Sequence, residues 1–387
     1  MSHLLVLNAG SSSLKFAVFD RALAEICRGA ISAMGSAPRF QLETADDQSE
    51  KHAFSGASLS MDDALAYVLK RLADRFPNLR IAAIGHRIVH GGVEFTKPAV
   101  LTSQTLAKLR ELEPLAPLHQ PYNLAIVAEA QKHFPDAVQI GCFDTAFHAN
   151  RPKLQKLYGL PRALIDEGMI SYGFHGLSFQ FISGQLRKRF GCEAGGKVIV
   201  LHLGSGSSLC AMQNGHSLAT TMGFSPLDGP VMATRCGTID PGILLHLMLR
   251  KGMQPQAVED LLYRKSGLAG LSGTSGDMQS LLADTSDDAQ ETLDYFVLSV
   301  SRQIGALAAS MGGVDHLVFT AGIGENSAPV RARLANAAGW LGLELNEAAN
   351  DSGAVDIADK NSRIGCLVLK TNEELAMAEG MATLLEQ

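Results

Sequence analysis

Residues 4–20, LLVLNAGSSSLKFAVFD, determine what fold is expected for the rest of the chain. The continuous apolar run 4–7 predicts a buried strand, and residues 14–20 predict a second strand. Between them Gly10 lets a ligand approach the backbone, the serines offer donors, and Lys15 adds a charge suited to a phosphate. An ordinary hairpin turn has the same residue types, so this stretch alone leaves both interpretations open.

A stretch with the same layout occurs in the other half of the chain. Residues 198–210, VIVLHLGSGSSLC, repeat the apolar run, the Gly/Ser tip and the second apolar segment. Aligning Asn8 with His202 gives an offset of 194 residues, about half of the 387. A repeat of this period indicates a duplicated domain rather than a solenoid. Two such domains would form a cleft with a phosphate-binding hairpin on each wall, which suits a nucleotide.

Composition restricts the class of protein further. The chain is 46% hydrophobic and 19% charged, which predicts two or three folded domains without extended disorder. The net charge of -6 argues against nucleic acid and gives no reason to expect a membrane partner. A secretory signal is absent, and no apolar run approaches the ~18 residues of a membrane span. Six scattered cysteines without a C-x-x-C pair predict buried thiols, so a cytoplasmic location is expected.

Apolar periodicity predicts the order of the main elements. Helices are expected over 60–75, 102–112, 122–134, 178–190 and 286–311, and strands over 81–85, 138–143, 316–320 and 367–369. Ser60 is the expected N-cap of the first helix, with Asp62 and Asp63 in its first turn. Residues 30–60 are expected to be largely polar and irregular.

Residues that can carry chemistry follow several of these strands. Arg87 lies between His86 and His90 at a strand end, where anion binding is favoured over a surface role. Asp144 follows the strand 138–143, a position that suits catalysis or metal positioning, although it could also cap the next segment. His175 has flanking glycines that leave its ring approachable.

Two further segments favour anion binding. Arg235 is a second candidate anion-binding arginine. The strand 316–320 runs into a glycine-rich turn at 321–326, before a helix that starts near Pro329, and this arrangement is a natural phosphate seat. The chain has no G-x-x-x-x-G-K-[ST], H-E-x-x-H or G-x-S-x-G motif, which makes a P-loop ATPase, a zincin and an α/β-hydrolase poor fits.

Taken together, these segments resemble the acetate kinases of the acetate and sugar kinase, chaperone and actin superfamily. The resemblance covers nearly the whole length, and its specificity comes from many motifs in the right order. The motifs are residues 8–15, 85–92, 116–119, 143–148, 172–176, 202–204, Arg235, 322–326 and 371–375.

The resemblance implies an α/β fold of two duplicated actin/sugar-kinase-like (ribonuclease H-like) domains with an active-site cleft between them. Residues 1–148 plus 374–387 would form the acyl-substrate domain, and residues 149–373 the nucleotide domain. The implied reaction is reversible, Mg-dependent, in-line transfer of the ATP γ-phosphoryl group to acetate, which gives acetyl phosphate and ADP. Mg²⁺, with Mn²⁺ as a substitute, and a homodimer are also implied.

The resemblance also assigns roles to individual residues. Asn8 and Glu373 would hold the metal, and Arg87 would bind the substrate carboxylate. His175 and Arg235 would stabilise the transferring group, and Asp144 would be the essential catalytic carboxylate, read here as an orienting group because the substrate is already ionised. The acyl pocket falls on Val89, Leu118, Phe174 and Pro226. The nucleotide would contact Lys15, His202, Leu203, Gly204, Ser205, Gly206, Asp277, Met278, Gln279, Gly322, Ile323, Gly324, Glu325 and Asn326.

The chain departs from the family pattern at three of these places. Ser205 stands where an asparagine is usual, and Gln279 stands where an arginine is usual, so nucleotide affinity and purine choice are open. Thr238 stands where an aspartate is common, and the sequence offers no account of it.

Two other functions are considered beside acetate phosphorylation. A propionate kinase differs by one methylene in the acyl pocket, worth only about 1–3 kcal/mol, and residue types cannot decide between the two acids. A non-catalytic, nucleotide-dependent switch would share the fold. That function predicts decay of the charged set, yet Arg87, Asp144, His175, Arg235 and Glu373 are all present.

Overall fold

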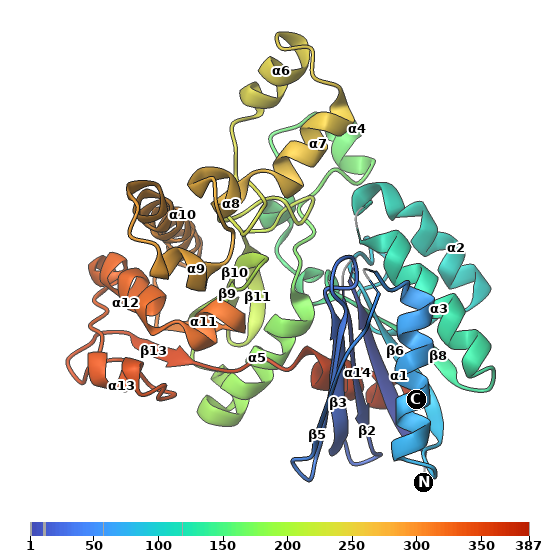
Figure 1. The fold of residues 1–387 in the computed structure, drawn as a ribbon. Coiled ribbons are helices and arrows are strands. Elements are labelled where there is room, and N and C mark those ends of the chain that lie inside the picture. Colours follow the sequence, from blue (N-terminus) through green and yellow to red (C-terminus); the bar gives the residue numbers. More distant parts are fainter. Residues whose placement is uncertain (1, 11–12, 57, 118, 387) are drawn as a thin grey trace. The chain divides into compact units, whose positions relative to one another are not determined.

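The computed structural model describes residues 2–10, 13–56, 58–117 and 119–386. The chain divides into two compact units (Figure 1). The first consists of Met1–Ala146 and Asn372–Gln387, and the second of Phe147–Thr371.

The first unit is built on an eight-stranded mixed sheet with the order β5-β4-β3-β2-β1-β6-β8-β7. The opening hairpin is confirmed, since β1 pairs antiparallel with β2 and parallel with β6. The strands are β1 His3–Ala9, β2 Leu14–Phe19, β3 Glu25–Ser32, β4 Arg39–Thr44, β5 Ser49–Ala53, β6 Ile81–Ile88, β7 Ala99–Val100 and β8 Val138–Phe143.

Helices cover both faces of this sheet. The apolar side chains of α1 and α3 join those of β1 and β2 in one buried cluster, which includes Leu65 and Leu7. The other face carries α14, and at Gly85 of β6 a Cβ atom would lie only 2.3 Å from the sulfur of Met381. Ser60 caps α1 as predicted, since its hydroxyl accepts from the N–H of Asp63 at 3.1 Å. The helices are α1 Met61–Arg75, α2 Ser103–Glu111, α3 Gln120–His133 and α14 Glu373–Leu385.

The prediction of an irregular segment over 30–60 is wrong for much of its length. Strands β3, β4 and β5 extend the sheet there. In β4 the buried Phe40 and Leu42 alternate with exposed polar residues, which is the pattern of a strand with one solvent-exposed face. Because polar residues interrupt all three strands, the segment has no continuous apolar run.

The second unit repeats the topology of the first around a five-stranded sheet with the order β11-β10-β9-β12-β13. Here β9 pairs antiparallel with β10 and parallel with β12, as β1 does with β2 and β6. The duplicated fold indicated by the repeated hairpin is thereby confirmed. The strands are β9 Lys197–Leu203, β10 Ser207–Gln213, β11 His216–Thr220, β12 His316–Thr320 and β13 Gly365–Val368.

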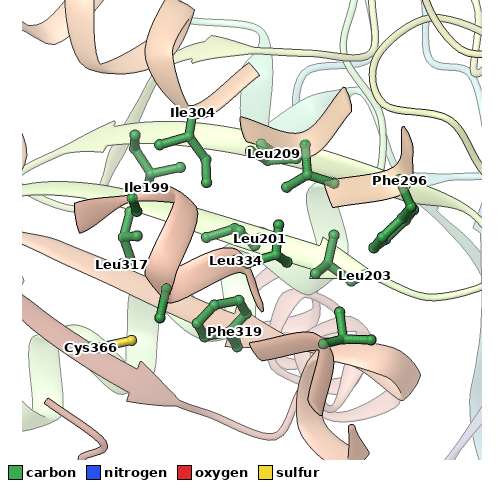
Figure 2. Close-up of a cluster of buried hydrophobic side chains, with 14 of the residues drawn as sticks. Ile199, Leu201, Leu203, Leu209, Phe296, Ile304, Leu317, Phe319, Leu334 and Cys366 are labelled. Carbon is green, nitrogen blue, oxygen red and sulfur yellow. The ribbon is translucent and has the colours of Figure 1, made fainter. Parts of the chain in front are cut away.

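The larger core cluster of the second unit packs α10 against its sheet, and a smaller one packs α5 against the same sheet. Figure 2 shows Phe296 and Ile304 of α10 beside Leu201 and Leu209 of the sheet. Gly312, at φ 67°, ends α10 in the left-handed conformation that glycine adopts readily. The helices are α4 Arg162–Asp166, α5 Gly176–Phe190, α6 Pro241–Leu249, α7 Pro255–Arg264, α8 Gly267–Ser272, α9 Met278–Ala283, α10 Asp287–Met311, α11 Ala321–Asn326, α12 Ala328–Ala337 and α13 Glu347–Asp351.

The cysteines are free thiols, as the sequence suggested, but not all of them are buried. Four lie in the interior, whereas Cys192 is exposed and Cys236 is half-buried. Among the described residues, no cluster of three or more His, Cys, Asp or Glu side chains could hold a metal ion. None of the helices in the described ranges has the length and apolar character needed to cross a membrane.

Candidate active site

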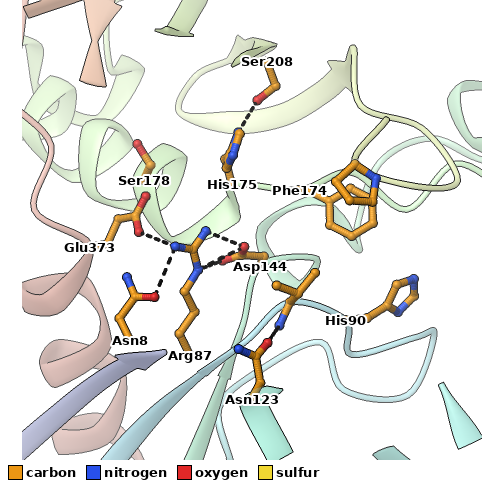
Figure 3. Close-up of polar contacts among 12 residues, drawn as sticks. Asn8, Arg87, His90, Asn123, Asp144, Phe174, His175, Ser178, Ser208 and Glu373 are labelled. Atoms are coloured by element: carbon orange, nitrogen blue, oxygen red, sulfur yellow. Dashed lines mark hydrogen bonds and ion pairs between the residues drawn. The ribbon is translucent and has the colours of Figure 1, made fainter. Parts of the chain in front are cut away.

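Arg87 is the centre of a polar cluster in the first unit (Figure 3). Its Nε lies 3.1 and 3.2 Å from the two carboxylate oxygens of Asp144, and its Nη2 lies 2.8 Å from Oδ2. Its Nη1 contacts Glu373 Oε2 at 3.1 Å and Asn8 Oδ1 at 3.4 Å. Four predicted site residues from four separate segments therefore meet at one guanidinium.

The sheet explains why these residues meet. Strands β1, β6 and β8 are parallel neighbours, so their carboxyl ends share one edge of the sheet. Asn8 and Arg87 lie near the ends of β1 and β6, and Asp144 directly follows β8. Glu373 is the first residue of α14, whose N-cap Asn372 accepts from the N–H of Leu375 at 2.9 Å.

Burial and charge act together on this cluster. Burial of Arg87 favours its neutral form, but the carboxylates of Asp144 and Glu373 outweigh burial and raise the pKa of the guanidinium. Burial raises the pKa of Asp144, and the neighbouring Arg87 opposes that rise. Since Asp144 is only 2% exposed and faces a guanidinium, its geometry suits orienting Arg87 better than taking a proton from a substrate.

Two oxygens in the cluster have the chemistry of a magnesium site. Asn8 Oδ1 and Glu373 Oε2 both lie next to the same guanidinium nitrogen of Arg87. Mg²⁺ prefers oxygen ligands and is often held by one or two protein oxygens together with waters and substrate phosphates. The two side chains therefore fit such an ion.

Side-chain amides of α3 fix the backbone beyond β6, and the sequence analysis did not identify them. Asn123 accepts from the N–H of Val89 at 3.0 Å and donates to the carbonyl of Ala9 at 2.8 Å. Gln120 accepts from the N–H of His90 at 3.1 Å and donates to the carbonyl of the same residue at 3.0 Å. Two buried amides three residues apart in a helix were the available signal, since such groups need polar partners.

The two histidines beside Arg87 are buried and neutral. Burial lowers the pKa of His86 to about 4, against the opposing effect of its 2.7 Å hydrogen bond with Gln139. Burial likewise lowers the pKa of His90 to about 4. Neither ring therefore adds positive charge near the end of β6 at neutral pH.

Three other residues of the first unit were predicted to contact a substrate: Lys15, Val89 and Leu118. Lys15 of β2 pairs with Asn8 across the hairpin, and its exposed side chain borders a surface hollow of about 290 Å³. Val89 is buried beside its Asn123 contact. Leu118 lies outside the described residues, as do Ser11 and Ser12 of the hairpin tip.

In the second unit, His175 directly precedes α5 and has a left-handed backbone with φ 56°. Its Nδ1 lies 2.8 Å from Ser208 Oγ (Figure 3), and its ring stacks on His202 with centroids 4.2 Å apart. The preceding Phe174 is buried, and its carbonyl lies 3.0 Å from Nε2 of His148.

Arg235 and His175 face the same small space in the second unit. A Cβ atom at Gly206 would lie 3.4 Å from His175 Nε2 and 3.5 Å from Arg235 Nη1. The same Nη1 donates to the carbonyl of Pro226 at 2.9 Å, which fixes the guanidinium. An imidazole and a guanidinium, both able to carry positive charge, therefore lie close to the position that a side chain at residue 206 would occupy.

The segments predicted to surround the nucleotide lie beside one another. The β9–β10 hairpin tip is tied to the Arg235 segment by a hydrogen bond from the N–H of Ala233 to the carbonyl of Ser205 at 3.2 Å. A Cβ atom at Gly204 would lie 3.9 Å from that of Ala321, and one at Gly276 would lie 2.5 Å from the carbonyl of Ala233. Residues 321–326 form the short helix α11, where the sequence predicted a turn.

Several side chains in these segments serve the fold. Met278 is buried in the core, and Asp277 caps α9 by accepting from the N–H of Ser280 at 2.9 Å. The Glu325 carboxylate accepts from the N–H groups of Ala321 at 2.8 Å and Thr371 at 3.0 Å. Any nucleotide contact made by Met278 would therefore come from its backbone, whereas Gln279 is exposed.

Thr238, which the sequence left unexplained, forms hydrogen bonds with the loop that contains Asp228 and Gly229. Its hydroxyl donates to Asp228 Oδ1 at 2.7 Å, and its N–H donates to the carbonyl of Gly229 at 2.8 Å. A hydroxyl can donate to this carboxylate, whereas an aspartate in its place would set two carboxylates against each other.

Known proteins are similar to this chain over nearly its whole length. The model of the acetokinase family matches residues 3–379. An acetate kinase of Rhodopseudomonas palustris (strain TIE-1) is 44% identical over 383 residues, covering 97% of this chain and 96% of the relative. A propionate kinase structure from Francisella tularensis subsp. tularensis SCHU S4 has TM-score 0.91 and 32% identity, covering 98% and 99% of the two chains. A Porphyromonas gingivalis acetate kinase structure has TM-score 0.87 and 31% identity, with both chains covered completely.

Proposed function

The chain belongs to the acetokinase family, and on that premise we propose that it transfers the γ-phosphoryl group of ATP to acetate. The transfer is reversible and in line, and it gives acetyl phosphate and ADP. The observation that carries this proposal is the Arg87 cluster, in which a guanidinium is fixed by Asp144 at the carboxyl edge of the sheet.

The chemistry of the reaction matches the groups that the chain provides. A carboxylate with a pKa of about 4–5 is already ionised at neutral pH, so the enzyme needs no strong base. The difficulty is to bring an anion against a polyanionic phosphate, and positioning with positive charge overcomes it. Arg87 binds the acetate carboxylate, and His175 and Arg235 stabilise the transferring group.

Asp144 serves this reaction by orienting Arg87. Its three contacts with the guanidinium leave Nη1 directed toward Glu373 and Asn8. Asn8 and Glu373 would hold Mg²⁺. When bound, that ion supplies positive charge to the nucleotide phosphates. Lys15 adds a point charge for the same phosphates.

The remaining proposed contacts divide between the acyl group and the nucleotide. By the resemblance to the family, the residues proposed to contact the methyl group are Val89, Leu118, Phe174 and Pro226. The hairpin tip 202–206, the α9 start 277–279 and helix α11 with residues 322–326 bind ATP or ADP. Their convergence supports this assignment, since glycine-rich backbone that lies close together offers N–H donors to phosphates.

Acetate is the first choice of substrate, and propionate is the alternative. The relatives at 39–44% identity are acetate kinases, whereas the propionate kinase structure is 32% identical. Trapping the acyl phosphate as a hydroxamate, from Mg-ATP with acetate, propionate or butyrate, tests the choice. The highest kcat/KM with acetate is expected, and a higher value with propionate would reassign the substrate. No product with any acid, despite nucleotide binding, would leave the non-catalytic switch.

We also propose that the protein acts as a homodimer in which α6 contributes to the interface. The nine residues of α6 are mostly apolar and none is buried within the chain. Leu245 is 54% exposed and Leu249 is 73% exposed. Light scattering should find a dimer, and L245E/L249E should be a folded monomer whose melting temperature no longer depends on protein concentration. A monomeric wild type, or a dimeric double variant, would exclude this interface.

A cytoplasmic location is proposed on chemical grounds. The nucleotide substrate is a cytoplasmic metabolite, and the six thiols are unpaired. Reducing compartments keep thiols in that state. Fractionation of the native cell should find the activity with the cytosolic proteins, and recovery from the periplasm or medium would contradict the proposal.

A further inference from the structure

Strand register places a hydroxyl beside a histidine in the second unit. Ser208 of β10 pairs directly with His202 of β9, so their side chains lie next to each other on one face of the sheet. His175 contacts both, because its Nδ1 lies 2.8 Å from Ser208 Oγ and its ring stacks on His202 at an interplanar angle of 21°. The imidazole of His175 is therefore held by one directional contact and one flat surface.

The stacking partner is itself fixed. Nδ1 of His202 lies 2.8 Å from Ser178 Oγ, and that oxygen lies 2.9 Å from Thr371 Oγ1. Ser178 belongs to α5, the helix that His175 precedes. The His202 ring therefore cannot rotate without breaking its contact with Ser178 of α5, a residue that also contacts Thr371.

The opposite edge of the His175 ring faces the space beside Gly206. Nε2 is the nitrogen 3.4 Å from the Cβ position of Gly206, and Arg235 Nη1 lies 3.5 Å from the same position. An anionic oxygen there would need an N–H from His175, not a lone pair. Which ring nitrogen carries the proton of the neutral imidazole is therefore decisive for the role proposed for His175.

We propose that Ser208 is a positioning residue for phosphoryl transfer, because its hydroxyl donates to Nδ1 of His175 and thereby keeps the ring proton on Nε2. This inference rests on the proposed function of the same site. When the ring is an imidazolium, Nδ1–H donates to Ser208 Oγ instead, and Nε2 still presents a proton. The Ser208 hydroxyl can therefore pair with Nδ1 of either the neutral or the charged ring. In both cases Nε2 carries a proton toward the space beside Gly206.

Burial makes the hydroxyl difficult to replace. Ser208 is 0% exposed, so solvent does not reach Oγ in the wild-type chain. An alanine at this position removes the donor to Nδ1, and the neutral ring can then take either tautomer. A ring with its proton on Nδ1 would turn a lone pair toward the transferring phosphoryl group, and the reaction would slow.

The direct test is ¹⁵N NMR of protein labelled at histidine, because nitrogen shifts report the tautomer of each ring. The His175 signals are assigned by their loss in H175N, and spectra are compared for wild type, S208A, S208T and S217A. Ser217 is the matched control: it is a buried strand serine whose Oγ lies 2.8 Å from Nδ1 of His148. We expect the Nε2–H tautomer of His175 in wild type, S208T and S217A, and a mixture of tautomers in S208A.

Hydroxamate kinetics on the same proteins supply the functional readout. We expect kcat of S208A to fall by about 2- to 10-fold with little change in KM, and S208T to recover most of it, since only part of the His175 population then presents Nε2–H. An unchanged His175 tautomer in folded S208A, or kcat equal to wild type, would overturn the inference. If wild-type protein makes no acyl phosphate, the proposed function fails, while the NMR comparison still decides whether Ser208 sets the tautomer.

Discussion

Arg87 and Asp144 form a bidentate pair in which the guanidinium Nε and Nη2 both contact the carboxylate, at distances of 2.8–3.2 Å. Arg87 belongs to β6, and Asp144 directly follows β8, the parallel neighbour of β6. Bidentate geometry fixes the plane of the guanidinium as well as its position. The carboxylate that resembles the family's essential residue is therefore best understood through the arginine it orients.

Replacing Asp144 with asparagine is predicted to reduce kcat by about 10²-fold or more while leaving the fold intact. The amide keeps one oxygen for Arg87 but lacks the negative charge and places an N–H group against a guanidinium donor. Hydroxamate formation measures the loss. D74N is the control, because Asp74 contacts Arg71 on the exposed surface of α1 at 3.2 Å. Near-wild-type kcat in D144N would contradict the orienting role.

Gly206→Ala is predicted to reduce activity without destabilising the protein. Gly206 does not adopt a positive φ, and the new methyl group meets no atom closer than 3.4 Å. The methyl group would instead fill the space between His175 Nε2 and Arg235 Nη1. A loss of kcat of about 10-fold or more is expected, with unfolding by urea unchanged.

The matched control for that variant is Gly184→Ala in α5, where an added Cβ meets nothing within 4 Å. Alanine should stabilise this helix by about 0.5–1 kcal/mol and leave kcat unchanged. Full activity in G206A would show that the space beside Gly206 is not used by the reacting group.

Asn123→Ala is predicted to destabilise the first unit and to raise KM for acetate. The variant leaves the N–H of Val89 and the carbonyl of Ala9 without their buried partner, which costs about 1–3 kcal/mol for an unsatisfied group. Urea unfolding and acetate titrations measure the two effects. Asn361, which is exposed, provides the control variant N361A. Equal stability of N123A and N361A would show that the amide bridge is dispensable.

Acid is predicted to destabilise the protein through its buried histidines. Burial lowers the pKa of His86 and His90 to about 4 and that of His148 to about 3, whereas unfolded histidine titrates near 6.5. Between these values the unfolded chain binds more protons, so the stabilisation present above pH 6.5 is lost as the pH falls toward 4. Each histidine contributes a slope of up to about 1.4 kcal/mol per pH unit.

The histidine contribution can be measured by comparing H86Q with wild type. The free energy of unfolding by urea, recorded between pH 7.5 and 5, should fall less steeply in H86Q because one of the three titrating groups is gone. Parallel slopes for the two proteins would exclude His86 as a source of the acid sensitivity.

The sequence predicted the repeated hairpin, most of the longer helices and the residues of the Arg87 cluster for identifiable reasons. Apolar runs determine buried strands, and the chemistry follows at strand ends such as those before Asp144 and Arg87. It did not predict β3 to β5, although the alternation in β4 was an available signal, and β5 gave no signal because its five residues are almost all polar and exposed. Nor could it assign Asn123 or Ser208, since their roles depend on neighbours distant in sequence.

Side-chain direction was the other quantity that the sequence could not supply. Met278 and Glu325 belong to segments predicted to bind the nucleotide, yet one is a core residue and the other binds backbone N–H groups. A motif identifies a segment, whereas packing decides which of its atoms are available. The helical conformation of residues 321–326 is a further case, because the glycines there favoured a turn.

Arg87 is the group proposed to bind the acyl substrate, and replacing it gives the sharpest test of the proposed function. Acetate-dependent hydroxamate formation from Mg-ATP should be measured for wild type, R87A and R71A, where Arg71 is an arginine of α1 paired with Glu50. We predict product from wild type and R71A, and a rate lower by on the order of 10³-fold in R87A. Acetate-dependent product at the wild-type rate in R87A would contradict the account.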